Sequence, residues 1–217
     1  MNFYSTFQAI IGSAVSEHPI MDAQERMALL TTEGQTIETV KQLTPSLTSL
    51  LGKPQRLLQD DPDYYIAIDL MTSTYYVCYR TLLMVDIDFY KGQADQQETV
   101  IAEIRAYAIE HGISFDLYRS RNGIHAFLIS RPADYKADRD IQLMLDLKAD
   151  FFYVVYSNIR GWSVRLNRKT TEAVMKYAFL GRVGVGQPDA YLLKLVTLHL
   201  KLVDVFKNVE PSAMFGN

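Results

Sequence analysis

Two carboxylates stand two residues apart at the end of an apolar run, in the stretch "TLLMVDIDFYKG". Residues i and i+2 of a β-strand face the same side, so Asp86 and Asp88 are expected to lie side by side. Like charges at that spacing repel unless a cation or a proton lies between them. The pattern therefore predicts either a divalent-metal site or, without any chemistry, a strand that runs out into a polar turn.

A second group of polar residues flanks a tight turn in "FDLYRSRNGIHAFLIS". Asn122-Gly123 is a strong hairpin signal between two segments of strand composition. Ser120 stands just before the turn and His125 just after it. A histidine in such a strand is either a structural residue or part of a site, and both interpretations stay open from these residues alone.

The densest basic cluster of the chain lies in "RGWSVRLNRKT". It contains Arg160, Arg165, Arg168 and Lys169. Guanidinium groups bind phosphate oxygens in a bidentate manner, so the cluster predicts an anion site. The alternative is a charged strand edge that protects a sheet from pairing with other chains.

Taken in this order, the three stretches resemble the motifs of the archaeo-eukaryotic primase superfamily, the primases and primase-polymerases. Asp86 and Asp88 match the metal-binding carboxylates that end a strand in that family. Ser120, Gly123 and His125 match its serine and histidine on a glycine turn. The segment "VRLNRKT" resembles its arginine-containing strand and lysine-bearing loop, and the resemblance covers roughly residues 64 to 170.

The resemblance implies a DNA-replication primase or primase-polymerase that transfers nucleotides from NTP or dNTP along a single-stranded DNA template. Mg²⁺ or Mn²⁺ would be bound by Asp86 and Asp88, because both ions prefer oxygen ligands. The residues expected to contact the nucleotide are Ser120, His125, Arg165 and Lys169. The basic residues expected to contact nucleic acid are Arg119, Arg121, Arg160 and Arg168. A helicase or another replication protein is the expected partner.

The sequence departs from the family pattern at its third motif, where a further aspartate is expected on a strand. The neighbouring positions are Ser157, Asn158 and Ile159. Asp116 and Asp150 are the two carboxylates considered as replacements. If neither reaches the metals, the expected function is a catalytically degenerate relative that binds nucleotide or single-stranded nucleic acid.

Two unrelated functions also fit parts of the sequence. A nucleotide-sugar transferase uses paired aspartates on Mn²⁺, but usually needs a larger nucleotide-binding domain than 217 residues supply. An RNA-recognition-like sheet binds single strands by stacking bases on exposed aromatic side chains. The aromatic residues considered for such a platform are Tyr75, Tyr76, Tyr79 and Phe127.

Composition narrows the class of protein. Hydrophobic residues make up 48% of the chain and aromatic residues 12%, which is typical of a folded globular protein. The net charge of −3 means that nucleic-acid binding requires a local basic patch. The single cysteine excludes an internal disulfide. With no apolar stretch of about 18 residues and no signal peptide, we expect a cytoplasmic protein without membrane contact, and the resemblance suggests a plasmid, phage or viral replicon.

The order of elements predicts an α+β fold with a mixed or antiparallel sheet, which the resemblance would make RRM-like. Residues 1–58 are expected to be a helical segment, and residues 59–217 one compact primase-like domain. The expected strands are 64–70, 74–89 with a bend near Arg80-Thr81, 114–120, 124–130, 151–156 and 162–166. The expected helices after residue 58 are 95–110, 137–148, 170–180 and a C-terminal helix over 190–206, with a loop at 181–189.

Overall fold

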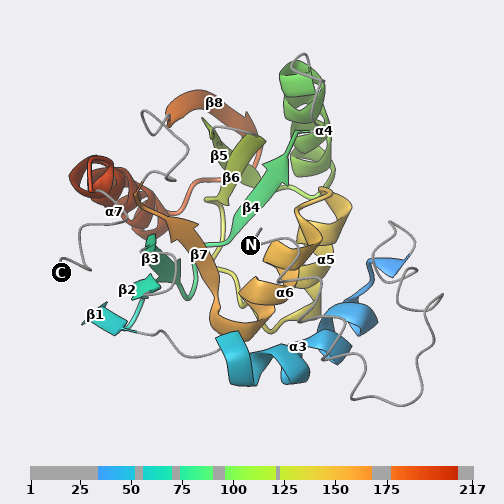
Figure 1. Cartoon of the computed structure of the whole chain (residues 1–217). Helices are drawn as coiled ribbons and strands as arrows, with labels where there is room; N and C mark the ends of the chain where they lie inside the picture. The colour runs from blue at the N-terminus through green and yellow to red at the C-terminus, as the bar shows by residue number, and fades with distance from the viewer. Residues whose placement is uncertain are drawn as a thin grey trace.

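The structure of the protein is a computed structural model. It describes residues 34–51, 56–69, 74–89, 96–120, 123–167 and 177–209. In these residues two four-stranded antiparallel sheets lie among five helices (Figure 1). The predicted α+β class with an antiparallel sheet is therefore confirmed.

The first sheet has the strand order β1-β2-β3-β7. Its strands are β1 (Arg56–Asp60), β2 (Tyr64–Asp69), β3 (Thr74–Tyr79) and β7 (Trp162–Arg165). Alternation gives each strand two different faces. Val77 and Tyr79 belong to the main hydrophobic core, whereas Tyr76 and Cys78 lie on the other face with Tyr65 and Ala67.

The second sheet has the strand order β4-β6-β5-β8. Its strands are β4 (Met84–Asp88), β5 (Ser114–Arg119), β6 (Gly123–Leu128) and β8 (Ala178–Gly184). The predicted bend at Arg80-Thr81 separates β3 from β4. It carries the chain from one sheet into the other, so that β4 becomes an edge strand of the second sheet.

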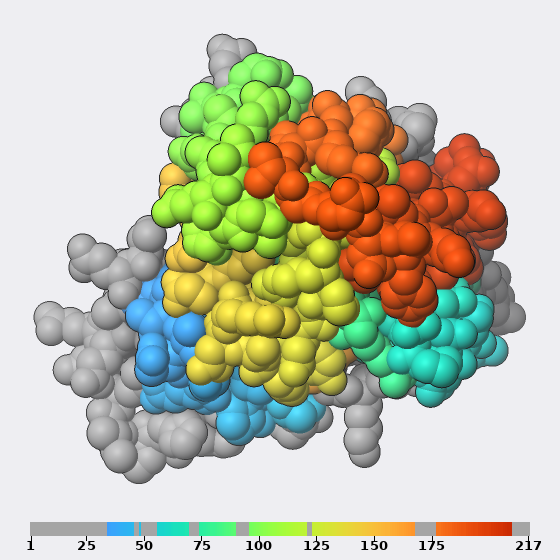
Figure 2. Space-filling model, turned by 180° about the vertical axis from the view of Figure 1, so that it is seen from behind, coloured from blue at the N-terminus to red at the C-terminus, as the bar shows by residue number. Residues whose placement is uncertain are grey.

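The helices cover the faces of the two sheets. They are α3 (Ile37–Leu51), α4 (Gln97–Glu110), α5 (Asp138–Asp146), α6 (Phe151–Arg160) and α7 (Ala190–Phe206). Helix α3 packs on α6, and α4 packs on β5 and β8. Seen from behind, the C-terminal segment (orange to red) extends from α4 (green) to the region of β1–β3 (cyan) (Figure 2).

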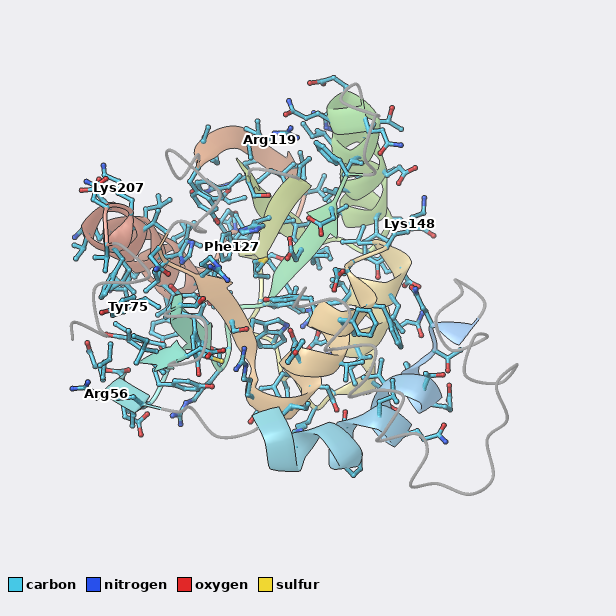
Figure 3. The ribbon with its side chains drawn as sticks, in the orientation of Figure 1. Arg56, Tyr75, Arg119, Phe127, Lys148 and Lys207 are labelled. Atoms are coloured by element: carbon cyan, nitrogen blue, oxygen red, sulfur yellow. The ribbon has the colours of Figure 1, made fainter. Side chains whose placement is uncertain are left out.

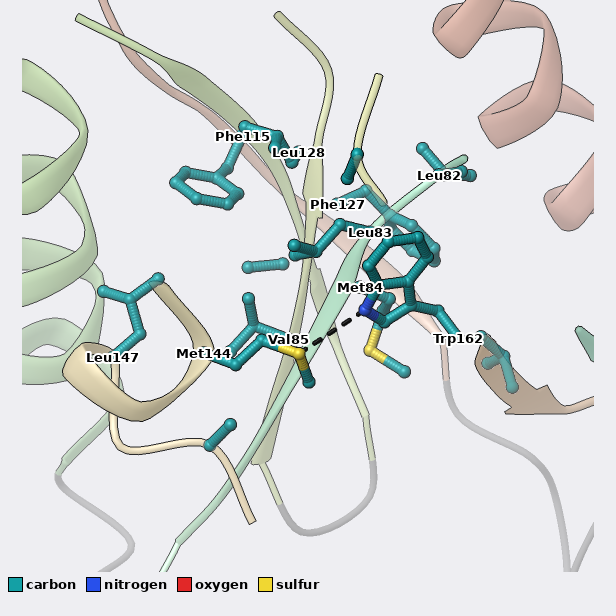
Figure 4. Packing of buried hydrophobic residues seen from close by; sticks show 14 of the residues in the cluster. Leu82, Leu83, Met84, Val85, Phe115, Phe127, Leu128, Met144, Leu147 and Trp162 are labelled. Atoms are coloured by element: carbon teal, nitrogen blue, oxygen red, sulfur yellow. Dashed lines mark hydrogen bonds between the residues drawn. The ribbon is translucent and has the colours of Figure 1, made fainter. Parts of the chain in front are cut away.

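One hydrophobic core joins the second sheet to α5 and to the first sheet (Figure 4). Val85 and Phe115 are fully buried on β4 and β5, and Met144 of α5 packs beside them. Trp162 of β7 is also fully buried, and its Nε1 donates to Met144 Sδ at 3.4 Å. Burying such side chains stabilises a fold by roughly 1.5–3 kcal/mol each, so this core fixes β4, the strand that carries Asp86 and Asp88.

The strand predicted at residues 151–156 is wrong, because this segment forms the first part of helix α6. Its aromatic and β-branched composition favoured a strand, yet the buried residues recur with helical spacing at Phe151, Val154, Val155 and Ile159. Asp150 begins the helix by accepting from the backbone N–H of Tyr153 at 2.8 Å. The helical spacing of the buried residues and the Asp150 cap therefore determined the structure of this segment, although its composition favoured a strand.

Three further expectations need correction or fall outside the described residues. Residues 56–58, the end of the segment expected to be helical, form part of β1, and α3 is one continuous helix that contains Pro45. Residues 178–184, divided between an expected helix and a loop, form β8. The expected helices within residues 1–33, and residues 170–176, lie outside the described residues.

Among the helices that the structure describes, none has the length and apolar character needed to cross a bilayer.

Candidate functional site

Asp86 is the middle residue of β4 and Asp88 its last residue, so both aspartates lie on the predicted strand. Their two-residue spacing within one strand puts both side chains on the same face of the second sheet. The Asp86 side chain is 27% exposed, and Asp88 is exposed at the strand end. The pair therefore combines one sheltered and one open carboxylate at a sheet edge.

His125 lies directly across from Asp86, because the two residues are cross-strand partners in the β4–β6 pair. The distance from His125 Nε2 to Asp86 Oδ1 is 3.4 Å. The sequence alone did not predict which residue of the aspartate strand would pair with His125. Antiparallel pairing brings the imidazole and the first carboxylate into contact.

The predicted hairpin between β5 and β6 is confirmed on both sides of its tip. Ser120 N donates to the carbonyl of Gly123 at 3.0 Å, and Arg121 lies outside the described residues. Gly123 pairs with Asp88, and a Cβ at this glycine would lie 1.9 Å from the carbonyl oxygen of Ile87. Only glycine therefore lets the hairpin approach the strand end that carries the two aspartates.

Replacing Gly123 with alanine is expected to cost about 3 kcal/mol of folding stability, because the backbone of β4 must move to admit the methyl group. Chemical denaturation measures the loss. Gly112→Ala is the matched control: Gly112 has φ of 64° but open space around it, so its cost is about 1 kcal/mol of backbone strain alone. Equal losses in the two variants would contradict the close approach at Gly123.

Asp150 is the carboxylate that the fold brings to Asp86. The backbone N–H of Asp150 donates to the carbonyl of Asp86 at 2.8 Å, which ties the start of α6 to the edge of β4. Burial raises the pKa of the Asp150 carboxyl, and the charge of Asp86 raises it further. Hydrogen bonds from the backbone of Tyr153 and Phe152 act in the opposite direction.

Asp116, the other replacement considered for the third motif, does not join this group. Its buried carboxylate accepts from Arg182 Nε at 2.7 Å and from Arg182 Nη2 at 3.0 Å. This bidentate ion pair links β5 to β8. Of the two sequence candidates, the structure therefore favours Asp150.

Two of the predicted basic residues lie on the first sheet and at the end of α6. The Arg160 guanidinium lies 4.7 Å from the ring centre of Tyr76 and 5.5 Å from that of Tyr156, and it donates to Ser163 Oγ at 3.2 Å. Arg165 on β7 pairs across the sheet with Tyr76. Both arginines are thus on the sheet face opposite the main core.

The other basic residues are not brought together with them. Arg119 alternates with Tyr118 on β5, so it faces the side of the second sheet opposite His125. Its guanidinium lies 4.4 Å from the ring centre of Phe89, and Figure 3 places Arg119 near the ends of β5 and β8, away from Phe127. Arg168 and Lys169 lie outside the described residues.

The four aromatic residues considered for a stacking platform do not form an exposed surface. Tyr79 and Phe127 are fully buried in the main core, and Tyr76 is buried on the other face of the first sheet. Tyr75 packs against Phe206 of α7, with ring centres 5.0 Å apart. Bases cannot stack on these rings in this arrangement.

Sequence reasoning missed two residues beside His125. The Tyr177 hydroxyl lies 3.2 Å from His125 Nδ1, and the buried His199 ring packs against Tyr177 with ring centres 5.4 Å apart. Tyr177 fell in a segment expected to be helical, and His199 in an apolar helix. No local motif marks either residue, because only the tertiary fold brings Tyr177, directly before β8, and His199 of α7 close to His125.

The carboxylates of Asp86 and Asp150 suit a hard cation that takes only part of its ligands from the protein. In the part of the chain that the structure describes, no three His, Cys, Asp or Glu side chains converge closely enough to enclose a metal ion. Mg²⁺ is commonly bound by one or two carboxylates, with waters and substrate phosphates as its other ligands. The pairing of Asp86 with Asp150 fits that second arrangement.

No protein-family model, curated protein or solved structure matches this chain.

Proposed function

We propose that this protein is a template-directed, metal-dependent nucleotidyltransferase of the primase-polymerase kind. The observation that carries the proposal is that Asp86 contacts His125 across the sheet and is joined through its backbone carbonyl to Asp150. These residues come from β4, β6 and the start of α6. Phosphoryl transfer depends on positioning and on neutralising charge, and a carboxylate pair beside a histidine would provide for both by holding a divalent cation.

Asp86, with Asp150 or Asp88 as a second carboxylate, would hold Mg²⁺ or Mn²⁺, and waters and substrate phosphates would be the other ligands. The bound cation would orient the triphosphate and offset the charge that develops during in-line displacement. Burial, and to a smaller extent the charge of Asp86, raises the pKa of Asp150, so a cation beside the two carboxylates would stabilise the ionised form of Asp150.

The remaining residues have roles suited to an anionic substrate. His125 directs Nε2 toward the Asp86 side, where an N–H group would donate to a phosphate oxygen. Ser120 would contact the phosphates beside it. Arg165 and Arg160, with Lys169 by resemblance, would neutralise the nucleotide or the template strand. A single-stranded DNA template and nucleoside triphosphates are the partners that this function requires, and a helicase or other replication protein would supply unwinding.

The direct test is incorporation of labelled nucleotides on a single-stranded DNA template, with Mg²⁺ or Mn²⁺ present and then removed with EDTA. Template-dependent products that disappear with EDTA would support the proposal. Both ribonucleotides and deoxynucleotides should be supplied, so that a preference for either one does not hide activity. The proposal would be overturned if the protein neither incorporated nucleotides nor bound nucleotide or template.

A second candidate function is a catalytically degenerate relative that binds nucleotide or single-stranded nucleic acid. The observation favouring it is that one oxygen of Asp150 already caps α6, which leaves this carboxylate less free to bind a cation. Fluorescence anisotropy with labelled single-stranded DNA separates the two functions. Retained binding without incorporation identifies the degenerate relative.

Replacing Asp150 with asparagine is expected to lower incorporation about 100-fold, while the fold remains intact. Asparagine caps a helix as well as aspartate does, so the change removes the charge and keeps the cap. The loss corresponds to about 2.7 kcal/mol of transition-state stabilisation. Asp189→Asn is the matched control, because Asp189 caps α7 by accepting from the N–H groups of Tyr191 and Leu192. Equal activity in both variants would remove Asp150 from the site.

A further inference from the structure

His125 is held at both of its ring nitrogens. Nε2 lies 3.4 Å from Asp86 Oδ1, and Nδ1 lies 3.2 Å from the Tyr177 hydroxyl. In a neutral imidazole one nitrogen donates and the other accepts, and each partner constrains that choice. The two contacts together therefore determine the tautomer.

The direction of the His125–Tyr177 hydrogen bond follows from the charge on the other side of the imidazole ring. A carboxylate accepts and does not donate, so the negative side chain of Asp86 favours a proton on the nitrogen that faces it. Nδ1 is then the acceptor, and the Tyr177 hydroxyl donates to it. Burial raises the pKa of Tyr177 well above its ordinary value, so the hydroxyl keeps the proton that it donates.

Tyr177 is itself fixed by neighbouring rings. It stacks on Tyr118 with ring centres 5.1 Å apart and planes 9° from parallel. Its ring also meets His199 edge-on, with ring centres 5.4 Å apart, and His199 is fully buried on α7. The position of the hydroxyl is thus set by β5 and α7, two elements outside the β4–β6 pair.

We propose that Tyr177 is a positioning residue that holds His125 as the Nε2–H tautomer with this nitrogen directed toward Asp86. The consequence for nucleotide binding rests on the proposed function, because there the Nε2–H group donates to a phosphate oxygen. The tautomer itself does not depend on that function. The two parts can therefore fail separately.

The test of the tautomer is a ¹⁵N–¹H spectrum of imidazole-labelled protein without nucleotide, at about pH 8.5, where ordinary histidines are neutral. A His125→Gln spectrum assigns the signals. In the native protein we expect a pyrrole-type Nε2 and a pyridine-type Nδ1. In Tyr177→Phe, which keeps the stacked ring but removes the donor, we expect Nδ1 to shift toward the pyrrole type as the second tautomer becomes populated.

Tyr118→Phe is the matched control, because it removes a hydroxyl from the other ring of the same stack and leaves the His125–Tyr177 bond in place. An unchanged tautomer in Tyr177→Phe, or the same change in both variants, would overturn the proposal. Thermal unfolding of both variants detects any loss of the folded structure. A general loss of structure would not change the tautomer in Tyr177→Phe alone.

The kinetic consequence is a fall of about fivefold in kcat/KM for the nucleotide in Tyr177→Phe, the size of one lost hydrogen bond. Tyr118→Phe should retain the native value. A tautomer shift in a protein that incorporates no nucleotide would uphold the role of Tyr177 and overturn the proposed function. A tautomer shift with unchanged kcat/KM in an active enzyme would overturn the consequence for nucleotide binding.

Discussion

Replacing Asp86 with asparagine is expected to reduce metal-dependent incorporation by about three orders of magnitude, or about 4 kcal/mol in the activation free energy. Asp86 has the central position, because it contacts His125 across the sheet and its backbone carbonyl accepts from Asp150. Asparagine keeps the size of the side chain but loses the charge that attracts a divalent cation. Steady-state incorporation with Mg²⁺ and with Mn²⁺ measures the effect.

The same substitution should leave the fold intact. The charge of Asp86 contributes to the raised pKa of Asp150, so removing it relieves repulsion within a partly buried pair. Asp204→Asn is the control, because Asp204 is exposed on α7 and should retain native activity. Incorporation at the native rate by Asp86→Asn would remove the carboxylate from the chemistry, whereas loss in both variants would point to damage outside the site.

Acid is expected to destabilise the protein through His199, with a loss on the order of 4 kcal/mol between about pH 6.5 and about pH 3. This histidine is fully buried on α7, between Tyr79, Phe127 and Tyr177. Neither ring nitrogen has a hydrogen-bond partner within the described residues. Burial, and secondarily the charge of His125, lowers the pKa of His199 from its ordinary 6.5 to about 3.

The sign follows from proton counting. Between the two pKa values the unfolded chain carries a proton on His199 and the folded protein does not, so unfolding takes up a proton. The contribution of neutral His199 to the free energy of unfolding is fully present above about pH 6.5 and is lost as the pH falls toward 3. Urea unfolding at a series of pH values measures this dependence.

His199→Leu isolates the contribution of this residue from that of the carboxylates. The variant should lose the part of the pH dependence due to His199. It should also be more stable than the native protein at pH 7 by about 1–3 kcal/mol, because two unpartnered buried nitrogens are removed. His111→Leu is the comparison, since His111 is exposed and stacks on Tyr107. An unchanged pH profile in His199→Leu would contradict the assignment.

The parts of the fold that the sequence predicted correctly are those with a strong local signal. The helix of α4 ends before Gly112, which has φ of 64°, and α7 spans the predicted residues. The β5–β6 hairpin follows from Asn122-Gly123 and alternating apolar residues. By contrast, β1 and β8 gave little local signal: β1 is exposed along its whole length, and β8 contains Gly181 and Gly184.

The site was predictable in its motifs but not in its assembly. The spacing of Asp86 and Asp88 fixed their common face, and the hairpin fixed the position of His125. His125 contacts Asp86 because of the register between β4 and β6. Asp150 contacts Asp86 because it begins helix α6. Tyr177 directly precedes β8 and His199 lies on α7, and such contacts between distant segments leave no pattern in a single sequence.

The pairing of β3 with β7 has a consequence for how the protein folds. Cys78 Sγ donates to the carbonyl of Arg160, and Tyr79 pairs with Trp162, so the first sheet is completed by a strand that follows all of β4 to α6. Contacts so distant in sequence form only after loop-closure entropy has been overcome. We therefore expect slow refolding, with the β7 side of β3 left open as a transient aggregation-prone edge until the chain through Trp162 has been synthesised.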